Sequence, residues 1–146
     1  MANDRRLAAV APVTTLVDSC ALLDVLTDDP TWGSWSSEAI AAADSAGELV
    51  INPLVYAEVS AGYEKVEEVD AAVPSDIFRR EPLPYEAGFL AAKAFVSYRR
   101  RGGARTSPLP DFYIGAHAAV MRYRVLTRDA ARFRTYFPSI ELLAPN

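Results

Sequence analysis

Thr14-Thr15-Leu16-Val17-Asp18 is a short β-branched run that ends in a carboxylate, and Ser19-Cys20-Ala21-Leu22-Leu23 turns directly into a helix. A second apolar run, Leu49-Val50-Ile51, is followed by Asn52-Pro53. Asparagine is a favoured helix N-cap, and proline is favoured at the first helical position. A third run, Arg124-Val125-Leu126-Thr127, closes at Asp129. Strands that alternate with helices in this way predict an α/β fold around a mostly parallel sheet.

The rest of the chain extends this pattern to a three-layer α/β/α sandwich with four or five strands. Residues 77–83 predict an edge strand, because Pro82 and Pro84 exclude a central one, and residues 140–143 predict the last strand. A long amphipathic helix is expected from Tyr85 to Gly102-Gly103. The other expected helices cover residues 31–46, 54–61, 65–72, 111–123 and 130–137.

Length and composition favour one ordinary globular domain. The chain has 146 residues, of which 51% are hydrophobic and 23% charged. We assign residues 14–146 to this domain and residues 1–13 to an N-terminal extension, whose apolar run is too short for a signal peptide and is broken by Pro12. No run approaches the roughly 20 apolar residues of a membrane span. Cys20 is the single cysteine, so no internal disulfide is possible. We therefore predict a cytoplasmic protein with no membrane partner.

Charge is distributed unevenly along the chain. Residues 1–98 hold six lysines and arginines against sixteen acids, whereas residues 99–146 hold nine arginines against three acids. A basic third made only of arginine is a plausible phosphate-facing surface. An equally open alternative is that arginine replaces lysine throughout this chain, which has only two lysines.

Four acidic residues lie where a strand ends or a helix begins: Asp18, Glu58, Asp111 and Asp129. Asp111 opens a helix in which Gly115, four residues later, is expected to leave space beside it. Ligands gather at the carboxyl ends of parallel strands. Four carboxylates there would make the oxygen-only set that suits Mg²⁺ or Mn²⁺. This pattern is typical of a metal-dependent hydrolase that acts on phosphate esters.

Four segments in this order carry a family resemblance: residues 16–19, 52–59, 110–118 and 126–133. Together they resemble the PIN domain, and within it the VapC-type toxins of bacterial toxin–antitoxin pairs. The resemblance implies a single-strand endoribonuclease in which one or two Mg²⁺ or Mn²⁺ ions are held by the four acids, with Ser19 or Thr127 supporting them. It also implies an RNA substrate, a cognate antitoxin protein and a homodimer. Many relatives carry a further acid where this chain has Arg132, so Asp129 would supply the fourth ligand alone.

Substrate binding needs cations around such an acidic cage. Candidate RNA-binding residues lie in the loop before Asp111 and beside Asp129: Arg99, Arg100, Arg101, Arg105, Arg128 and Arg132. Arginine can pair with phosphate through two hydrogen bonds and can stack on bases.

Several other residues have plainer interpretations. We expect His117 to be a packed or surface histidine, Cys20 to be a small buried thiol, and Asp24 to be exposed to solvent. Trp32 and Trp35 are expected to pack their helix, within the protomer or at a dimer face.

Other functional classes fit less well. A phospho-receiver domain needs a lysine after its last strand, and only Ala144-Pro145-Asn146 follows here. A haloacid-type phosphatase would have Asp-x-Asp after the first strand, and a dinucleotide-binding protein a Gly-x-Gly-x-x-Gly motif; the chain has neither. A catalytically inactive PIN-like binding scaffold, and a PIN nuclease in RNA processing outside a toxin–antitoxin pair, remain as alternatives.

Overall fold

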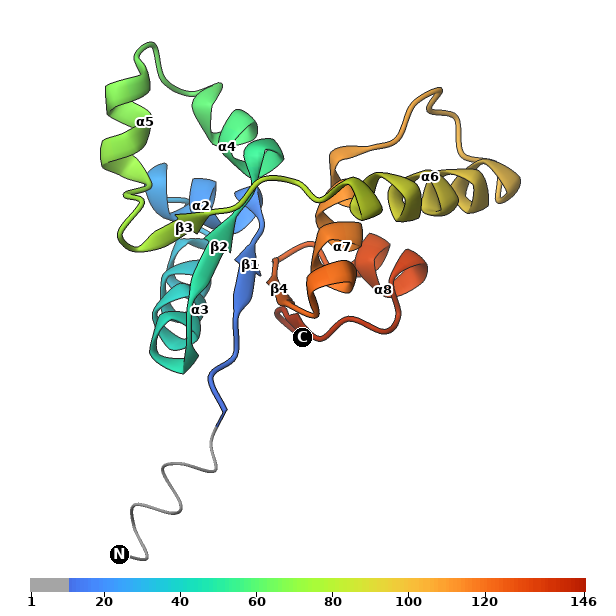
Figure 1. The fold of residues 1–146 in the computed structure, drawn as a ribbon. Coiled ribbons are helices and arrows are strands. Elements are labelled where there is room, and N and C mark those ends of the chain that lie inside the picture. Colours follow the sequence, from blue (N-terminus) through green and yellow to red (C-terminus); the bar gives the residue numbers. More distant parts are fainter. Residues whose placement is uncertain (1–10) are drawn as a thin grey trace, which may run out of the picture.

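A computed structural model describes residues 11–146 (Figure 1). Five parallel strands form one sheet in the order β3-β2-β1-β4-β5. The strands are β1 (Thr15–Val17), β2 (Leu49–Ile51), β3 (Phe78–Arg80), β4 (Arg124–Leu126) and β5 (Leu142–Leu143). The predicted α/β fold with a mostly parallel sheet of four or five strands is therefore confirmed. The predicted extension over residues 1–13 lies almost wholly outside the described residues, so its boundary stays a prediction.

Seven helices within residues 11–146 connect and cover the strands. They are α2 (Ser19–Leu26), α3 (Gly33–Ala46), α4 (Pro53–Ser60), α5 (Val66–Ala72), α6 (Tyr85–Arg100), α7 (Pro110–Met121) and α8 (Ala131–Tyr136). Figure 1 shows α3 along one side of the strands and α7 with α8 along the other. None of the described helices is long and apolar enough to cross a bilayer.

The helix starts follow from the local sequence. Asp18 caps α2 by accepting a hydrogen bond from the backbone N–H of Ser19. Asn52 caps α4 by accepting bonds from the N–H groups of Leu54 and Val55, with Pro53 at the first helical position as predicted. Each cap directly follows a buried strand, so the sheet fixes where both helices begin.

Two hydrophobic clusters hold the layers together. The larger one surrounds the strands and includes residues of α2, α3, α4, α5, α7 and α8. The smaller one joins α6 to α7 and the end of α8, with Phe112 fully buried at its centre. Gly115 of α7 lies against Phe137, a residue of this smaller cluster. A Cβ atom at Gly115 would collide with the ring of Phe137, so the missing side chain at Gly115 makes room for that ring.

Element boundaries differ from the predicted ones by a few residues. Helix α3 begins at Gly33 rather than residue 31, and β5 is only Leu142–Leu143. Helix α7 stops at Met121, because Arg122 adopts the left-handed conformation with φ 59°. The predicted edge strand is confirmed in shorter form, since β3 lies at the border of the sheet.

Candidate functional site

The carboxyl ends of β1 and β4 bring Asp18 and Asp129 to one edge of the sheet. These strands are parallel neighbours, with Val17 paired to Leu126. Asp18 follows β1 immediately, and Asp129 lies in the loop after β4. These two acids therefore follow neighbouring strands.

Helices α4 and α7 deliver the other two acids to the same edge. Glu58 lies in the second turn of α4 and Asp111 in the first turn of α7. Burial raises the pKa values of Glu58 and Asp111, and the negative charge of Asp18 raises both further. The charge of Asp111 also raises the pKa of Glu58. Such repulsion indicates that these carboxylates lie near one another.

Asp18 is the buried centre of the group. Only 4% of the residue is exposed. Burial raises the pKa of Asp18, and hydrogen bonds from Thr127, Cys20 and the Ser19 backbone oppose that rise. The Thr127 hydroxyl donates to Oδ2 of Asp18 at 2.9 Å, and the Ser19 N–H donates to Oδ1 at 2.8 Å. These donors fix the orientation of the Asp18 carboxylate.

Thr127 also holds the loop that carries Asp129. Its Oγ1 atom accepts a hydrogen bond from the Asp129 backbone N–H at 3.1 Å, and Thr127 is completely buried. One hydroxyl therefore joins the Asp18 side chain to the backbone of Asp129. The structure thus places Thr127 where a supporting residue was expected.

Ser19 and Arg132 act on the two remaining acids. Burial is the main cause that raises the pKa of Glu58, and a hydrogen bond from the Ser19 side chain lowers it. Burial likewise raises the pKa of Asp111, while Arg132 opposes the rise with an ion pair of 3.2 Å. Arg132, predicted to contact RNA, lies within the acidic group in this structure.

The chemistry of these groups fits a hard divalent cation. They offer only oxygen ligands, and three of them have pKa values raised by burial and by one another, which a cation would relieve. Within residues 11–146, however, no three His, Cys, Asp or Glu side chains converge closely enough to enclose an ion. Mg²⁺ is commonly bound through one or two carboxylates and keeps several waters, so a closed protein cage is not required.

Cys20 contacts this group, which the sequence did not reveal. Its Sγ lies 3.4 Å from Oδ2 of Asp18 and 3.4 Å from Oγ1 of Thr127. Burial and the charge of Asp18 raise the pKa of Cys20 to about 11, so the thiol stays protonated at neutral pH. The side chain acts here as a weak hydrogen-bond donor to Asp18 rather than as a thiolate.

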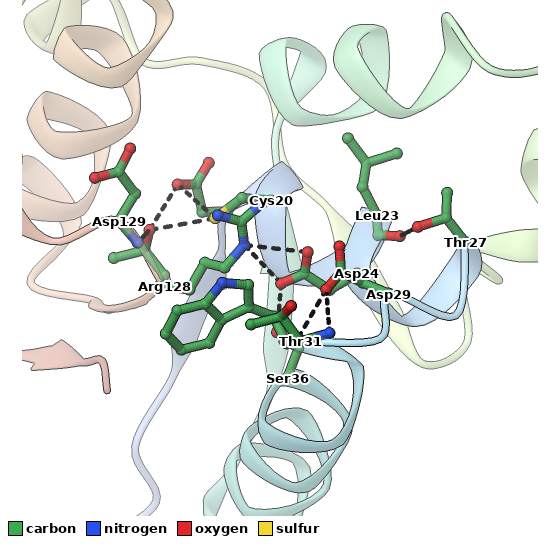
Figure 2. A network of polar contacts seen from close by, with 12 residues as sticks. Cys20, Leu23, Asp24, Thr27, Asp29, Thr31, Ser36, Arg128 and Asp129 are labelled. Atoms are coloured by element: carbon green, nitrogen blue, oxygen red, sulfur yellow. Dashed lines mark hydrogen bonds and ion pairs between the residues drawn. The ribbon is translucent and has the colours of Figure 1, made fainter. Parts of the chain in front are cut away.

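Asp24 is buried, so the expectation that it is exposed was wrong. Only 2% of the residue is accessible. Figure 2 shows Ser36 and Arg128 converging on the Asp24 carboxylate, where the Ser36 hydroxyl donates at 2.8 Å and Arg128 Nε donates at 2.8 and 3.1 Å. Arg128 also lies over the ring of Trp32. Arg128, predicted to bind RNA, contacts Asp24 of α2 and Trp32 at the start of α3, and so holds the loop that carries Asp129 against these helices.

The arginines at the end of α6 have different positions. The guanidinium of Arg99 donates to the carbonyls of Gly103 and Arg105 and so holds the loop that follows α6. The guanidinium of Arg101 lies 5.5 Å from the ring centre of Tyr136. Arg100 and Arg105 are exposed. Whether any of them contacts RNA stays a prediction.

His117 is packed, as predicted. It is completely buried, with Nδ1 bonded to Asn52 and Nε2 paired with Glu81. Because Asn52 caps α4 and His117 belongs to α7, this contact ties together the two helices that carry Glu58 and Asp111.

Comparison with known proteins identifies a family and a set of similar folds. The PIN domain family matches residues 15–137, and no curated protein matches the chain in sequence. VapBC2 from Rickettsia felis, solved with a DNA fragment from its promoter, contains a chain that matches with TM-score 0.70 and 13% identity, over 92% of this chain and all of that one. For VapBC-1 from nontypeable Haemophilus influenzae the TM-score is 0.69 and the identity 16%, over 90% of this chain and 98% of that one. For VapBC-5 from Mycobacterium tuberculosis, described as a member of the VapBC family of toxin–antitoxin systems, the TM-score is 0.55 and the identity 18%, over 91% of this chain and 98% of that one. At these identities the likeness to solved structures concerns the fold.

Proposed function

Because this chain belongs to the PIN domain family, we propose that it is a Mg²⁺- or Mn²⁺-dependent endoribonuclease that cuts single-stranded RNA. One observation carries the proposal: Asp18, Glu58, Asp111 and Asp129 lie at the carboxyl edge of the sheet, and burial together with neighbouring carboxylates raises the pKa values of Asp18, Glu58 and Asp111. Such an arrangement is costly in a protein without a cation, so a divalent ion is its natural partner.

A bound Mg²⁺ or Mn²⁺ would activate water for in-line attack on a phosphodiester and stabilise the charge that develops. The four carboxylates would hold the ion, some of them through its bound waters. Asp18 is best prepared for this, because Thr127 and the Ser19 backbone fix its two oxygens. The hydroxyl of Thr127 keeps Asp129 in register with Asp18. Arg132 beside Asp111 supplies a positive charge where a substrate phosphate would approach.

We further propose that the nuclease is the toxin of a type II toxin–antitoxin pair, bound by a small antitoxin and forming a homodimer. The support is the fold shared with chains of VapBC complexes along nearly their whole length. Trp35, Tyr56 and Tyr63 are large apolar residues that could line such protein contacts, but they pack against the core. Among residues 11–146, the most exposed large apolar side chains are those of Tyr85, at 97%, and Phe89, at 64%.

Metal binding is tested by thermal unfolding. Mn²⁺ should raise the melting temperature of the wild type, because it binds the native state alone. Asp18→Asn and Asp111→Asn should each lose most of this rise while remaining folded, and Ser19→Ala should have a milder effect. Asp44→Asn, the same change at an exposed acid of α3, is the matched control. An unchanged Mn²⁺ response in both site variants would place the metal elsewhere.

The activity is tested by induced expression in a bacterial host with mapping of new RNA ends. Wild type should create specific new ends and arrest growth, whereas Asp18→Asn should do neither. Co-expression of the product of an adjacent small gene should restore growth. New ends without growth arrest would favour a PIN nuclease of RNA processing, and no new ends would favour an inactive scaffold.

A further inference from the structure

An open groove runs from the acidic group to a pair of tyrosines. It has a volume of about 320 Å³, and Asp111 and Asp129 line it together with Tyr98, Arg132 and Tyr136. This volume is at the lower end of the roughly 300–1,000 Å³ range of small-ligand sites. Two of the four acids and two aromatic rings therefore share one surface depression.

The tyrosines are held rigidly by the core beneath them. The ring of buried Phe112 meets Tyr136 edge-on at 5.2 Å and Tyr98 at 5.6 Å, measured between ring centres. Phe112 directly follows Asp111 at the start of α7. The position of the tyrosine rings is thus linked to that of the Asp111 carboxylate through Phe112.

Two guanidinium groups lie against aromatic rings of this region. Arg132 lies between Asp111, at 3.2 Å, and the Phe112 ring. Arg101 lies against the ring of Tyr136. Arg99 fixes the loop beyond Arg101 through the carbonyls of Gly103 and Arg105, which limits the freedom of this segment.

Flat rings flanked by guanidinium groups are the usual means of binding an unpaired nucleotide. Bases stack on aromatic side chains or on arginine planes, and the neighbouring phosphates pair with arginine. Resting on the proposed ribonuclease activity, we propose that this groove binds the RNA nucleotide next to the scissile phosphate. Its base stacks on Tyr136 beside Tyr98 and Arg101, and Arg132 contacts the phosphate that approaches Asp111 and Asp129.

The test compares Tyr136→Leu with two controls. Leucine keeps apolar bulk over Phe112 but removes the flat ring, whereas Tyr136→Phe keeps the ring. Tyr85→Leu makes the same change at an exposed tyrosine at the start of α6, outside the groove. Affinity for a labelled single-stranded RNA is measured by fluorescence anisotropy at low salt in EDTA, with the Mn²⁺-induced rise in melting temperature recorded for each variant.

Tyr136→Leu should weaken RNA binding roughly 5- to 150-fold, the range for loss of one stacked base. The KM for RNA should rise with little change in kcat, because stacking is made equally in the ground and transition states. Tyr136→Phe and Tyr85→Leu should stay within about twofold of wild type, since neither removes a stacking ring from the groove. The Mn²⁺ response should be retained in all three.

The outcomes separate this inference from the proposed activity. If wild type cleaves RNA and Tyr136→Leu binds it equally well, the groove is not the subsite, while the ribonuclease proposal stands. If wild type neither binds nor cleaves RNA, both fail. If Tyr136→Leu does not fold, crosslinking of wild type to RNA containing 4-thiouridine decides. A crosslink to the peptide that carries Tyr98 or Tyr136 supports the subsite, and crosslinks only elsewhere overturn it.

Discussion

Replacement of Asp24 by alanine should destabilise the protein markedly, although Asp24 belongs to none of the predicted ligands. Asp24 is 2% exposed, and its carboxylate accepts hydrogen bonds from Ser36 and Arg128. Ser36 is completely buried, so its hydroxyl would lose its acceptor in a place that water does not reach. Arg128 would lose its ion pair, but 34% of its side chain is exposed, so water can solvate part of the charge.

These contacts set the size of the effect. An unsatisfied buried hydroxyl costs about 1–3 kcal/mol. Loss of a partly exposed ion pair adds only about 1 kcal/mol, well below the cost for a fully buried pair. Asp24→Ala should therefore lower the free energy of unfolding by about 2–4 kcal/mol, which for a domain of this size lowers the melting temperature by about 5–15 °C. Asp24→Asn keeps an acceptor for Ser36 and should cost about 1 kcal/mol.

Urea unfolding at neutral pH measures these differences, with the midpoint expected to fall and the slope to stay constant. Asp44→Ala, at an exposed position of α3, is the matched control and should change the free energy of unfolding by less than about 0.5 kcal/mol. If Asp24→Ala were as stable as this control, the network around Arg128 would not fix the loop that carries Asp129, and the reasoning would be refuted.

Three further predictions test the surroundings of the site. The pKa of Cys20 is raised from 9.0 to about 11, so iodoacetamide at pH 7–8 should modify the native thiol roughly 100-fold more slowly than the urea-unfolded thiol. The rate for the native protein should rise as the pH approaches 11. Equal rates for the two states would contradict the burial of Cys20 beside Asp18. Gly115→Ala should cost about 1–3 kcal/mol in urea unfolding, because the added methyl group collides with Phe137; an unchanged midpoint would show that the ring moves away freely. Arg132→Gln should weaken RNA binding at low salt. It should not reduce the Mn²⁺-induced rise in melting temperature, because Arg132 competes with a cation for Asp111. Loss of that rise would instead give Arg132 a role in forming the metal site.

The sequence predicted the fold well because its signals are local. A buried strand that ends at a capping residue is visible in Val17-Asp18-Ser19 and in Ile51-Asn52-Pro53, and both caps are present in the structure. The alternation of strands and helices placed Asp18 and Asp129 after strands, and the structure shows that these strands are neighbours. The ends of α7 and β5 were missed because they depend on Arg122 in the left-handed conformation and on pairing with β4.

The surroundings of the site could not be predicted, because they depend on contacts between distant positions. Asp24 meets Ser36 twelve residues away and Arg128 more than a hundred residues away. The sequence gives no sign that Asp24 and Arg128 form an ion pair, so Asp24 was expected to be exposed. The pairing of Tyr98 with Tyr136 across the groove is equally absent from any local pattern.

The central claim is that the carboxylates at the sheet edge hold a divalent metal for RNA cleavage. Its most direct test is the cleavage of an end-labelled single-stranded RNA by purified, metal-free protein, with and without added Mn²⁺. Wild type should cut the RNA at defined positions only when Mn²⁺ is present, and Asp111→Asn should not cut under either condition, while Asp44→Asn should match wild type. Cleavage by wild type in EDTA, or undiminished cleavage by Asp111→Asn with Mn²⁺, would contradict the claim.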